Sequence, residues 1–428
     1  MRSALLSLVA LSLSSEALSA AIVTNGQDGV LQLPLKGISL ELWTPGRFKR
    51  KPRFSIPTVN DLFYTVPVAV GTPATPVSLA FSISTSVTWV NPNCSNISHL
   101  EGRRLCRDSG QFPKDFSKTF SSVDRANFVF LPGYGQRQMA FDTVMLGSSV
   151  ITSQSIGVAI NTTGVALGVL GAAAGPSSFD GRGDDVSIVH NMVRQGVTKR
   201  RAFSLDLRGA GSTDGSVVFG GIDTRKFSGP LVARTMIAGR NAPAAIMVDE
   251  VGVTSQDGTY SPVTEGPPFS ASLDTSYSIC YLPVPAVERI ARYFSSARRH
   301  DSVANDGSMY YTVDCRVAEL TGSVDFVMGS ATIKVPFKEL VGSDAGGGSC
   351  LLGVAAPPTD ADMKGHADFG NQTILGANFL RSVYAVFDWQ GREIHLAKSE
   401  DCGSNVRALD GSTTLASMVG ECDSRSEL

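Results

Sequence analysis

The sequence has little of what metal sites and nucleic-acid-binding surfaces require. It contains five histidines in 428 residues, and none lies in an HExxH motif or a Cys/His cluster. We therefore expect no metal ion and no cofactor. Basic and acidic residues are nearly balanced, with 37 Lys and Arg against 39 Asp and Glu and a formal net charge of −2. A nucleic-acid partner usually requires a basic face, so we expect none.

Two further absences narrow the class of protein. The chain has no GxSxG elbow and no GxxxxGK[ST] loop, so neither an α/β-hydrolase nor a nucleotide-dependent enzyme is indicated. Beyond the N-terminus, no stretch reaches the ~18 apolar residues of a membrane-spanning helix. We therefore predict that the mature protein has no membrane span.

The N-terminus has the parts of a secretory signal peptide. Arg2 precedes an apolar run over residues 4–13, and small residues follow at 17 and 19–21. This pattern predicts a signal peptide over 1–20 and a secreted, extracellular protein. Four Asn-X-Ser/Thr sequons agree with a secreted glycoprotein; they lie at Asn93, Asn96, Asn161 and Asn371.

Residues 21–53 form a separate segment that ends in the basic cluster RFKRKPR at 47–53. Two interpretations are open: a pro-segment that ends at the dibasic pair Lys49-Arg50, or a simple N-terminal extension. A second basic run, at residues 199–201, is interpreted as a solvated turn, with a processing site as the alternative.

Residues 54–398 are a succession of short runs rich in Val, Ile, Phe and Tyr, broken by Gly, Pro, Asn and Asp. This pattern predicts a mostly-β protein. Only segments such as 186–196 and 285–297 have the apolar spacing of helices. The polar, Ser/Thr-rich residues 403–428 predict a flexible tail.

The chain contains a weak internal repeat. FSIST at 81–85 is followed by VLG at 169–171, and LDTSY at 273–277 is followed by ILG at 374–376. Each half thus has a hydrophobic strand that ends in a short polar loop, and a later apolar-apolar-Gly motif. A duplicated β-domain, with one loop from each half meeting at a shared cleft, would produce this pattern.

Longer motifs, in the same order, resemble the pepsin-family aspartic proteases (peptidase family A1) of the secreted fungal type. The resemblance covers about residues 54–402. Its main carriers are YTVPVAVGTPATPVSLAF (64–81), GSVVFGGIDTRKFSGPL (215–231) and QTILGANFLRSVYAVFDWQGREIHLA (372–397).

The resemblance implies a fold and a partner. The fold would be all-β and bilobal, with a central cleft. An N-terminal β lobe with a flap would span 54–207, and a C-terminal β lobe would span 208–402. The protein would be a monomer that takes a peptide or protein segment into the cleft.

The family's chemistry requires one Asp-Thr/Ser-Gly loop in each lobe, because two close carboxylates must share one proton. In the second loop, Asp274 fits the catalytic position and Thr275 fits the next one. Ser276 stands where glycine is expected. The second loop therefore retains its carboxylate.

The first loop departs from the family pattern at three consecutive positions. Ser82 stands at the aspartate position, Ile83 at the threonine that would hydrogen bond across to the other loop, and Ser84 at the glycine. No Asp or Glu lies between Asp61 and Glu101, so no near neighbour can replace the carboxylate.

The flap of the family normally carries a tyrosine. Phe130 falls at that position when the segment is counted back from Asp142. A shifted alignment would use Tyr134, beside Gly133 at the expected hairpin tip. These residues would contact substrate together with residues 83–84 and 275–276.

The cysteine spacing fits the family. The resemblance implies disulfides between Cys94 and Cys106 and between Cys315 and Cys350. The total of seven is odd, so at least one cysteine is unpaired or pairs between chains. We expect Cys280 to be a buried thiol, and a bridge between residues 402 and 422 stays open.

Two functions follow from these residues. The first is a secreted aspartic-protease homologue with lost or strongly reduced peptidase activity, whose cleft binds a segment without cutting it. The second is an active endopeptidase that uses Asp274 with an unconventional partner. The substitutions at residues 82–84 discriminate between them.

Overall fold

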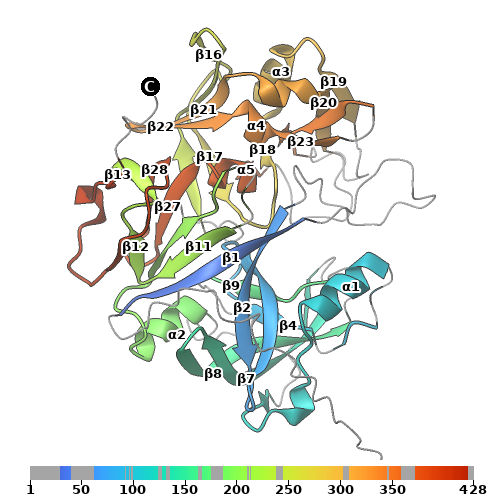
Figure 1. Ribbon diagram of the computed structural model, residues 1–428, viewed down its shortest axis with the longest axis vertical. Helices are drawn as coiled ribbons and strands as arrows, with labels where there is room; N and C mark the ends of the chain where they lie inside the picture. The colour runs from blue at the N-terminus through green and yellow to red at the C-terminus, as the bar shows by residue number, and fades with distance from the viewer. Residues whose placement is uncertain are drawn as a thin grey trace, which may run out of the picture.

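The computed structural model of the chain consists mainly of β-strands arranged in two lobes (Figure 1). Strands of the N-terminal half form the lower lobe in this view, and strands of the C-terminal half form the upper lobe. The mostly-β prediction is confirmed. The structure describes residues 29–39, 62–91, 93–95, 97, 100–123, 128–131, 135–161, 166–174, 187–209, 212, 214–237, 244–301, 308–344, 347–357 and 372–422.

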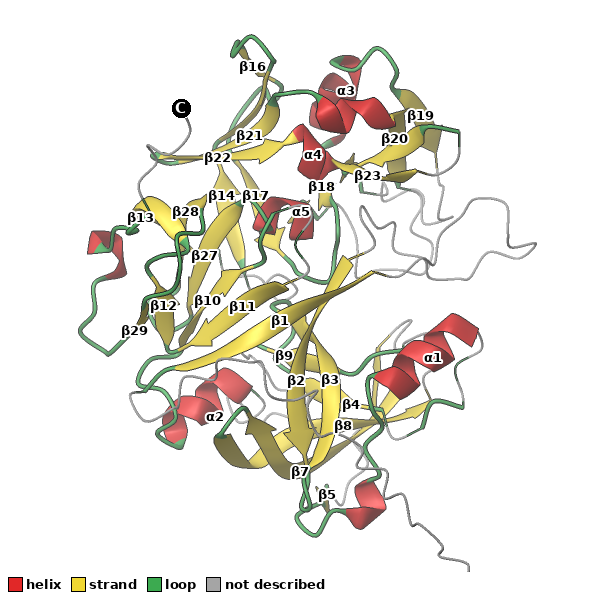
Figure 2. Cartoon of the chain, viewed as in Figure 1, coloured by secondary structure: helices red, strands yellow, loops and turns green. Residues whose placement is uncertain are grey.

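Short helices lie mostly outside the sheets (Figure 2). Helix α2 lies within the predicted segment 186–196, and α3 begins one residue before the predicted segment 285–297 and ends at Arg292, so both predicted helices are present. In α3 the buried residues Val287, Ile290 and Ala291 share one face, as the 3.6-residue period requires. The helices are α1 (Leu100–Asp108), α2 (Ile188–Arg194), α3 (Val284–Arg292), α4 (Phe337–Leu340) and α5 (Ala377–Leu380), with 3-10 turns η3 (Lys114–Phe116), η5 (Cys315–Glu319) and η6 (Leu415–Ser417).

One 14-stranded sheet runs through both halves of the chain. Its order is β13 (Phe227–Thr235), β28 (Glu393–Ser399), β27 (Val383–Asp388), β10 (Ala202–Asp206), β11 (Asp214–Phe219), β1 (Leu31–Ser39), β2 (Leu62–Val70), β3 (Thr75–Ser82), β9 (Val169–Gly171), β4 (Thr88–Val90), β8 (Ser149–Asn161), β7 (Gly135–Leu146) and β5 (Ser121–Ser122), with β6 (Phe128–Leu131) paired to β7.

The described residues also form four smaller sheets, three of which lie in the upper lobe (Figure 2). The five-stranded sheet has the order β14 (Ala245–Val248), β17 (Phe269–Leu273), β26 (Ile374–Leu375), β18 (Cys280–Tyr281) and β25 (Val354–Ala355). One four-stranded sheet has the order β16 (Tyr260–Pro262), β15 (Glu250–Thr254), β21 (Ser323–Met328) and β22 (Ala331–Pro336). The other has the order β19 (Arg298–Asp301), β20 (Met309–Asp314), β24 (Ser349–Leu352) and β23 (Val341–Asp344). The two-stranded sheet pairs β12 (Gly221–Asp223) with β29 (Val406–Ala408).

The internal repeat of the sequence corresponds to a repeated strand arrangement. In the first half, β9 pairs in parallel with β3 and antiparallel with β4, and β4 pairs in parallel with β8. In the second half, β26 pairs in parallel with β17 and antiparallel with β18, and β18 pairs in parallel with β25. The two apolar-apolar-Gly motifs therefore occupy equivalent strands, and the duplication is confirmed.

Strand β1 corrects the boundary expected at the N-terminus. It lies between β11 and β2 and pairs antiparallel with both. Leu31, Leu33 and Leu35 are buried and alternate with more exposed residues, as the two-residue period of a strand requires. Residues 31–39 are thus part of the folded core and do not lie outside a lobe that starts at 54. The pair Lys49-Arg50 lies outside the described residues, so its cleavage stays a prediction.

The predicted flexible tail is wrong for residues 403–422. Strand β29 pairs with β12, and Leu409 and Leu415 are buried in an apolar cluster with Phe227 and Tyr384. Because the segment is mostly polar, its composition did not predict that these two leucines pack against the end of the sheet. Residues 423–428 lie outside the described part of the chain.

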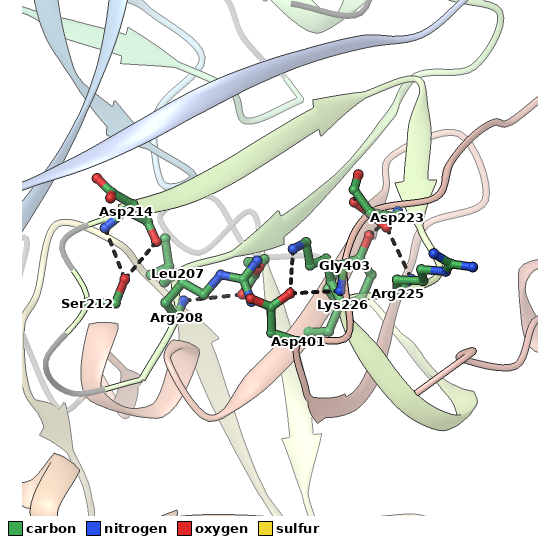
Figure 3. Close-up of polar contacts among 12 residues, drawn as sticks. Leu207, Arg208, Ser212, Asp214, Asp223, Arg225, Lys226, Asp401 and Gly403 are labelled. Carbon is green, nitrogen blue, oxygen red and sulfur yellow. Dashed lines mark hydrogen bonds and ion pairs between the residues drawn. The ribbon is translucent and has the colours of Figure 1, made fainter. Parts of the chain in front are cut away.

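Ion pairs also hold the beginning of this tail (Figure 3). The Asp401 carboxylate lies 2.6 Å from the Lys226 ammonium and 2.9 Å from the Arg208 guanidinium. Arg200 corrects the expectation of a solvated basic turn, because its guanidinium pairs with buried Asp388 at 2.6 Å and donates to the Thr413 carbonyl at 2.6 Å. Ion pairs and a hydrogen bond from different strands and loops therefore hold this segment against the sheet.

The cysteine predictions are confirmed. Disulfides join Cys94 to Cys106 and Cys315 to Cys350, and Cys280 is a free, buried thiol. Burial raises the pKa of that thiol to about 12. The open question about the last two cysteines is answered by a third disulfide, which joins residues 402 and 422.

The described residues contain neither a helix that could cross a membrane nor a cluster of side chains that could hold a metal ion. None of the helices there has the length and apolar character needed to cross a membrane. No group of three or more His, Cys, Asp and Glu side chains in that part of the chain is placed to hold a metal ion.

Candidate active site between the two loops

Each candidate loop begins where a buried strand ends. Strand β3 ends at Ser82, and β17 ends at Leu273, so Asp274 is the first residue after the strand. The backbone N–H of Asp274 donates to the Leu375 carbonyl on β26 at 3.1 Å, and the Ser82 carbonyl accepts from the N–H of Ala172 at 2.8 Å. Neighbouring strands therefore hold both loops by their backbones.

The glycine of each apolar-apolar-Gly motif lies directly against a loop. A Cβ on Gly171 would lie 2.6 Å from the Thr85 carbonyl oxygen, and a Cβ on Gly376 would lie 2.2 Å from the Ile279 carbonyl oxygen. Neither position has room for a side chain, which explains the glycine in both repeats.

The two loops meet although 194 residues separate them. The Thr275 hydroxyl donates to the Phe81 carbonyl at 2.7 Å. The hydroxyls of Ser82 and Ser276 are 3.3 Å apart. Ile83, where the resemblance implies a second cross-loop hydroxyl, is fully buried. One cross-loop bond of the family pattern is thus present, and a hydrocarbon side chain occupies the position of the other.

Asp274 is a buried carboxyl group surrounded by serines. It is 7% exposed, and its Oδ1 accepts from the Ser276 backbone N–H at 2.8 Å. The hydroxyls of Ser276 and Ser84 also hydrogen bond to it. Burial raises the pKa of Asp274 to about 6, and these hydrogen bonds oppose the increase.

Ser82 completes the cluster, at the position where the sequence resemblance predicts a carboxylate. It is 4% exposed, and its hydroxyl lies 3.0 Å from the Ser84 hydroxyl. Ser82 is thereby linked to Asp274 through Ser84 and Ser276. Among the described residues, the site brings together one carboxyl group and three hydroxyls.

Most of the chain matches one protein-family model. Residues 63–399 match the model of the family described as eukaryotic aspartyl protease. The chain belongs to the eukaryotic aspartyl protease family. The family model spans both loops, so Ser82 and Asp274 both lie inside the matched region.

Several curated aspartic proteases are similar to this chain. Candidapepsin-3 of Candida albicans is 28% identical over 364 residues, which cover 82% of this chain and 83% of that protein. Secreted aspartic protease 8 of Candida albicans is 25% identical over 341 residues, covering 78% and 75%. Probable aspartic-type endopeptidase opsB of Aspergillus fumigatus is 27% identical over 354 residues, covering 79% and 69%.

The segment predicted to form the flap contains the hairpin of β6 and β7. Phe130 pairs with Gln136 in its register, but the structure does not describe the Phe130 side chain. Gly133 and Tyr134 lie outside the described residues. The choice between Phe130 and Tyr134 as the flap aromatic therefore stays a prediction.

The predicted glycosylation sites are placed only in part. Asn93 is exposed beside the Cys94–Cys106 disulfide, which is compatible with modification. Asn161 is the last residue of β8, and its side chain is not described. Asn96 and Asn371 lie outside the described residues.

The sequence did not reveal what the two serines that replace glycine do. Ser84 and Ser276 read as lost glycines, whereas both are polar partners of Asp274. A signal was present: each serine lies two residues after the catalytic position of its loop, at 82 and 274. This symmetry indicates a paired role that a one-loop comparison does not reveal.

Proposed function

We propose that the protein is a secreted aspartic-protease homologue with lost or strongly reduced peptidase activity, and that its cleft binds a peptide or protein segment without cutting it. The observation that carries this proposal is the serine cluster around Asp274, with Ser82 at the first carboxylate position.

The chemistry supports a loss of rate. In a carboxylate pair, one ionised group takes a proton from water while the protonated partner polarises the scissile carbonyl. Serine hydroxyls do not ionise at acidic or neutral pH, so Asp274 alone cannot fill both roles. Loss of one acid–base group typically costs roughly 10²–10⁴-fold in rate.

Retention of the fold supports a remaining use for the cleft. The cross-loop bond from Thr275, both motif glycines and the hairpin of β6 and β7 are all present. The signal-like N-terminus, the disulfides and relatives named secreted aspartic proteases support secretion. We also propose that the protein is a glycosylated monomer.

A second candidate is an active endopeptidase that uses Asp274. With a pKa of about 6, this carboxyl is available as a base above that pH and as an acid below it. The neighbouring hydroxyls of Ser82 and Ser84 offer hydrogen bonds to a bound water.

Cleavage of a complex peptide pool tests the two candidates. Purified full-length protein is incubated with the pool at pH 3–7, and new termini are counted by mass spectrometry, with Asp274→Ala as the control. We expect no cleavage that depends on Asp274. Cleavage that the Asp274→Ala change abolishes would reject the non-cleaving function and support the second candidate.

Restoration of the first loop gives a second prediction. Ser82→Asp, Ile83→Thr and Ser84→Gly together supply the carboxylate, the cross-loop hydroxyl and the glycine of the family pattern. We expect this triple variant to gain acid peptidase activity in the same assay, and the added change Asp274→Ala to abolish it. If the triple variant gains no peptidase activity, other parts of the site must also have lost features that catalysis requires.

A further inference from the structure

Serine hydroxyls and one carboxyl group meet at the junction of the two loops. The Ser82 hydroxyl lies 3.0 Å from the Ser84 hydroxyl and 3.3 Å from the Ser276 hydroxyl, and Asp274 accepts hydrogen bonds from Ser276 and Ser84. Ser84 and Ser276 are half-buried, so the cluster retains an accessible side. Hydroxyls can rotate to accept as well as donate, which makes this group of oxygens suited to a donor from a ligand.

The Asp274 carboxylate has no cation beside it in the described structure. The groups that act on its pKa are its burial and the hydrogen bonds of Ser276 and Ser84, and no charged residue is among them. A buried carboxylate without a counter-ion is unfavourable. A cationic ligand group would therefore gain both charge neutralisation and hydrogen bonds there.

We propose that this cluster binds the primary ammonium group of a lysine side chain presented by a peptide or protein segment. The inference deepens the non-cleaving, peptide-binding function and rests on it. The ammonium group is a compact charge with three donors, which matches one carboxylate surrounded by hydroxyls. An arginine would need both carboxylate oxygens for a bidentate contact, and Oδ1 already accepts from the Ser276 N–H.

Among the described residues, no other charged group acts on the pKa of Asp274. The adjoining segments 82–85 and 374–376 contain only Ser, Ile, Thr, Leu and Gly. The loop of Asp274 itself contributes serines, Thr275 and Tyr277. Lysine binding should therefore follow the ionisation of Asp274 and strengthen as the pH rises through about 6.

The test uses three pools of N-acetylated, C-amidated octapeptides. The pools have lysine, acetyl-lysine or arginine at a fixed central position, and uncharged residues randomised elsewhere. Equilibrium dialysis against the full-length protein at pH 7.5 and 4.5, read by mass spectrometry, measures retention and cleavage in the same samples. The variant Asp274→Asn removes the charge, and Asp257→Asn makes the same change in an exposed turn.

We expect roughly 10- to 100-fold stronger retention of the lysine pool than of the acetyl-lysine pool at pH 7.5. The preference should shrink at pH 4.5, disappear in Asp274→Asn and persist in Asp257→Asn. Equal retention of lysine and acetyl-lysine pools by the unmodified protein, which needs no variant to fold, would overturn the inference. Stronger retention of the arginine pool would also overturn it.

The same samples separate this inference from the proposed function. Uncut peptides retained without a lysine preference would reject the inference and leave the non-cleaving function standing. Asp274-dependent cleavage would reject the non-cleaving function, while the lysine and acetyl-lysine pools would still decide the inference. If no pool is retained, the inference and the peptide-binding part of the proposed function are both wrong.

Discussion

Asp274 shows how a single residue can keep its position and change its surroundings. It follows a buried strand, as the family pattern requires, and it accepts the Ser276 N–H. The Ser82 hydroxyl lies where the sequence resemblance predicts the carboxyl group that would share its proton. Burial without a second carboxyl or a cation leaves one group with a pKa of about 6, and this shift has a consequence for stability.

Replacement of Asp274 by asparagine should stabilise the protein at neutral pH. An unfolded aspartate loses its proton near pH ~3.9, and the folded one near pH 6. Between these values the folded state binds more protons, so stability falls as the pH rises and the loss is complete above about pH 6. Two pKa units correspond to about 3 kcal/mol.

Urea unfolding at pH 4 and pH 7.5 measures this effect. We expect the free energy of unfolding of Asp274→Asn to exceed that of the unmodified protein by up to about 3 kcal/mol at pH 7.5, and by much less at pH 4. An equal difference at both values would mean that the Asp274 carboxyl is not the source of the pH dependence.

Strands β9 and β26 show how secondary-structure elements build the site. Each pairs in parallel with the strand that leads into a loop, and each is followed or ended by a glycine that lies against backbone. The loops are therefore shaped by close backbone packing.

A methyl group at Gly171 should disrupt the first loop. Its Cβ would lie 2.6 Å from the Thr85 carbonyl oxygen and 2.8 Å from the Ser86 carbonyl carbon, so backbone must move. We expect Gly171→Ala to lower the free energy of unfolding by roughly 1–3 kcal/mol or more.

Gly411→Ala is the matched control, because nothing lies within 4 Å of its Cβ position. That change should stay within about 0.5 kcal/mol. The urea midpoints of both variants measure this difference in stability. Equal midpoints would show that the first loop can move away from the added methyl group with little loss of stability.

The whole molecule is held together by segments from both ends of the chain. Strand β1 lies inside the 14-stranded sheet, and the tail packs Leu409 and Leu415 beside β13 and β27. The 402–422 disulfide closes this tail onto the end of the sheet. The tail thus belongs to the folded domain and stabilises it.

Removal of the tail disulfide should lower stability measurably. Cys402 and Cys422 are 20 residues apart, and a loop of that length corresponds to about 3 kcal/mol in the chain-entropy model. We expect the double variant Cys402→Ser/Cys422→Ser to unfold at a lower urea midpoint by about this amount. An unchanged midpoint would mean that the leucines and ion pairs suffice to hold the tail.

The sequence alone was sufficient for the family, the β-rich duplicated fold and two disulfide pairs. It also identified Asp274 and Ser82 as the equivalent positions of the two loops. These features depend on local patterns: strand periodicity, motif order and cysteine spacing. Such patterns remain visible in the chain because each residue acts mainly with its near neighbours or with a motif of known order.

Other features were decided only by the tertiary structure. The place of β1 in the sheet, the packed tail and the ion pair of Arg200 with Asp388 all join segments far apart in the chain. The hydrogen-bonded serines around Asp274 are of the same kind, because Ser82 and Ser276 meet across 194 residues. Local composition does not encode such contacts, since polar residues look alike whether they face water or a buried partner.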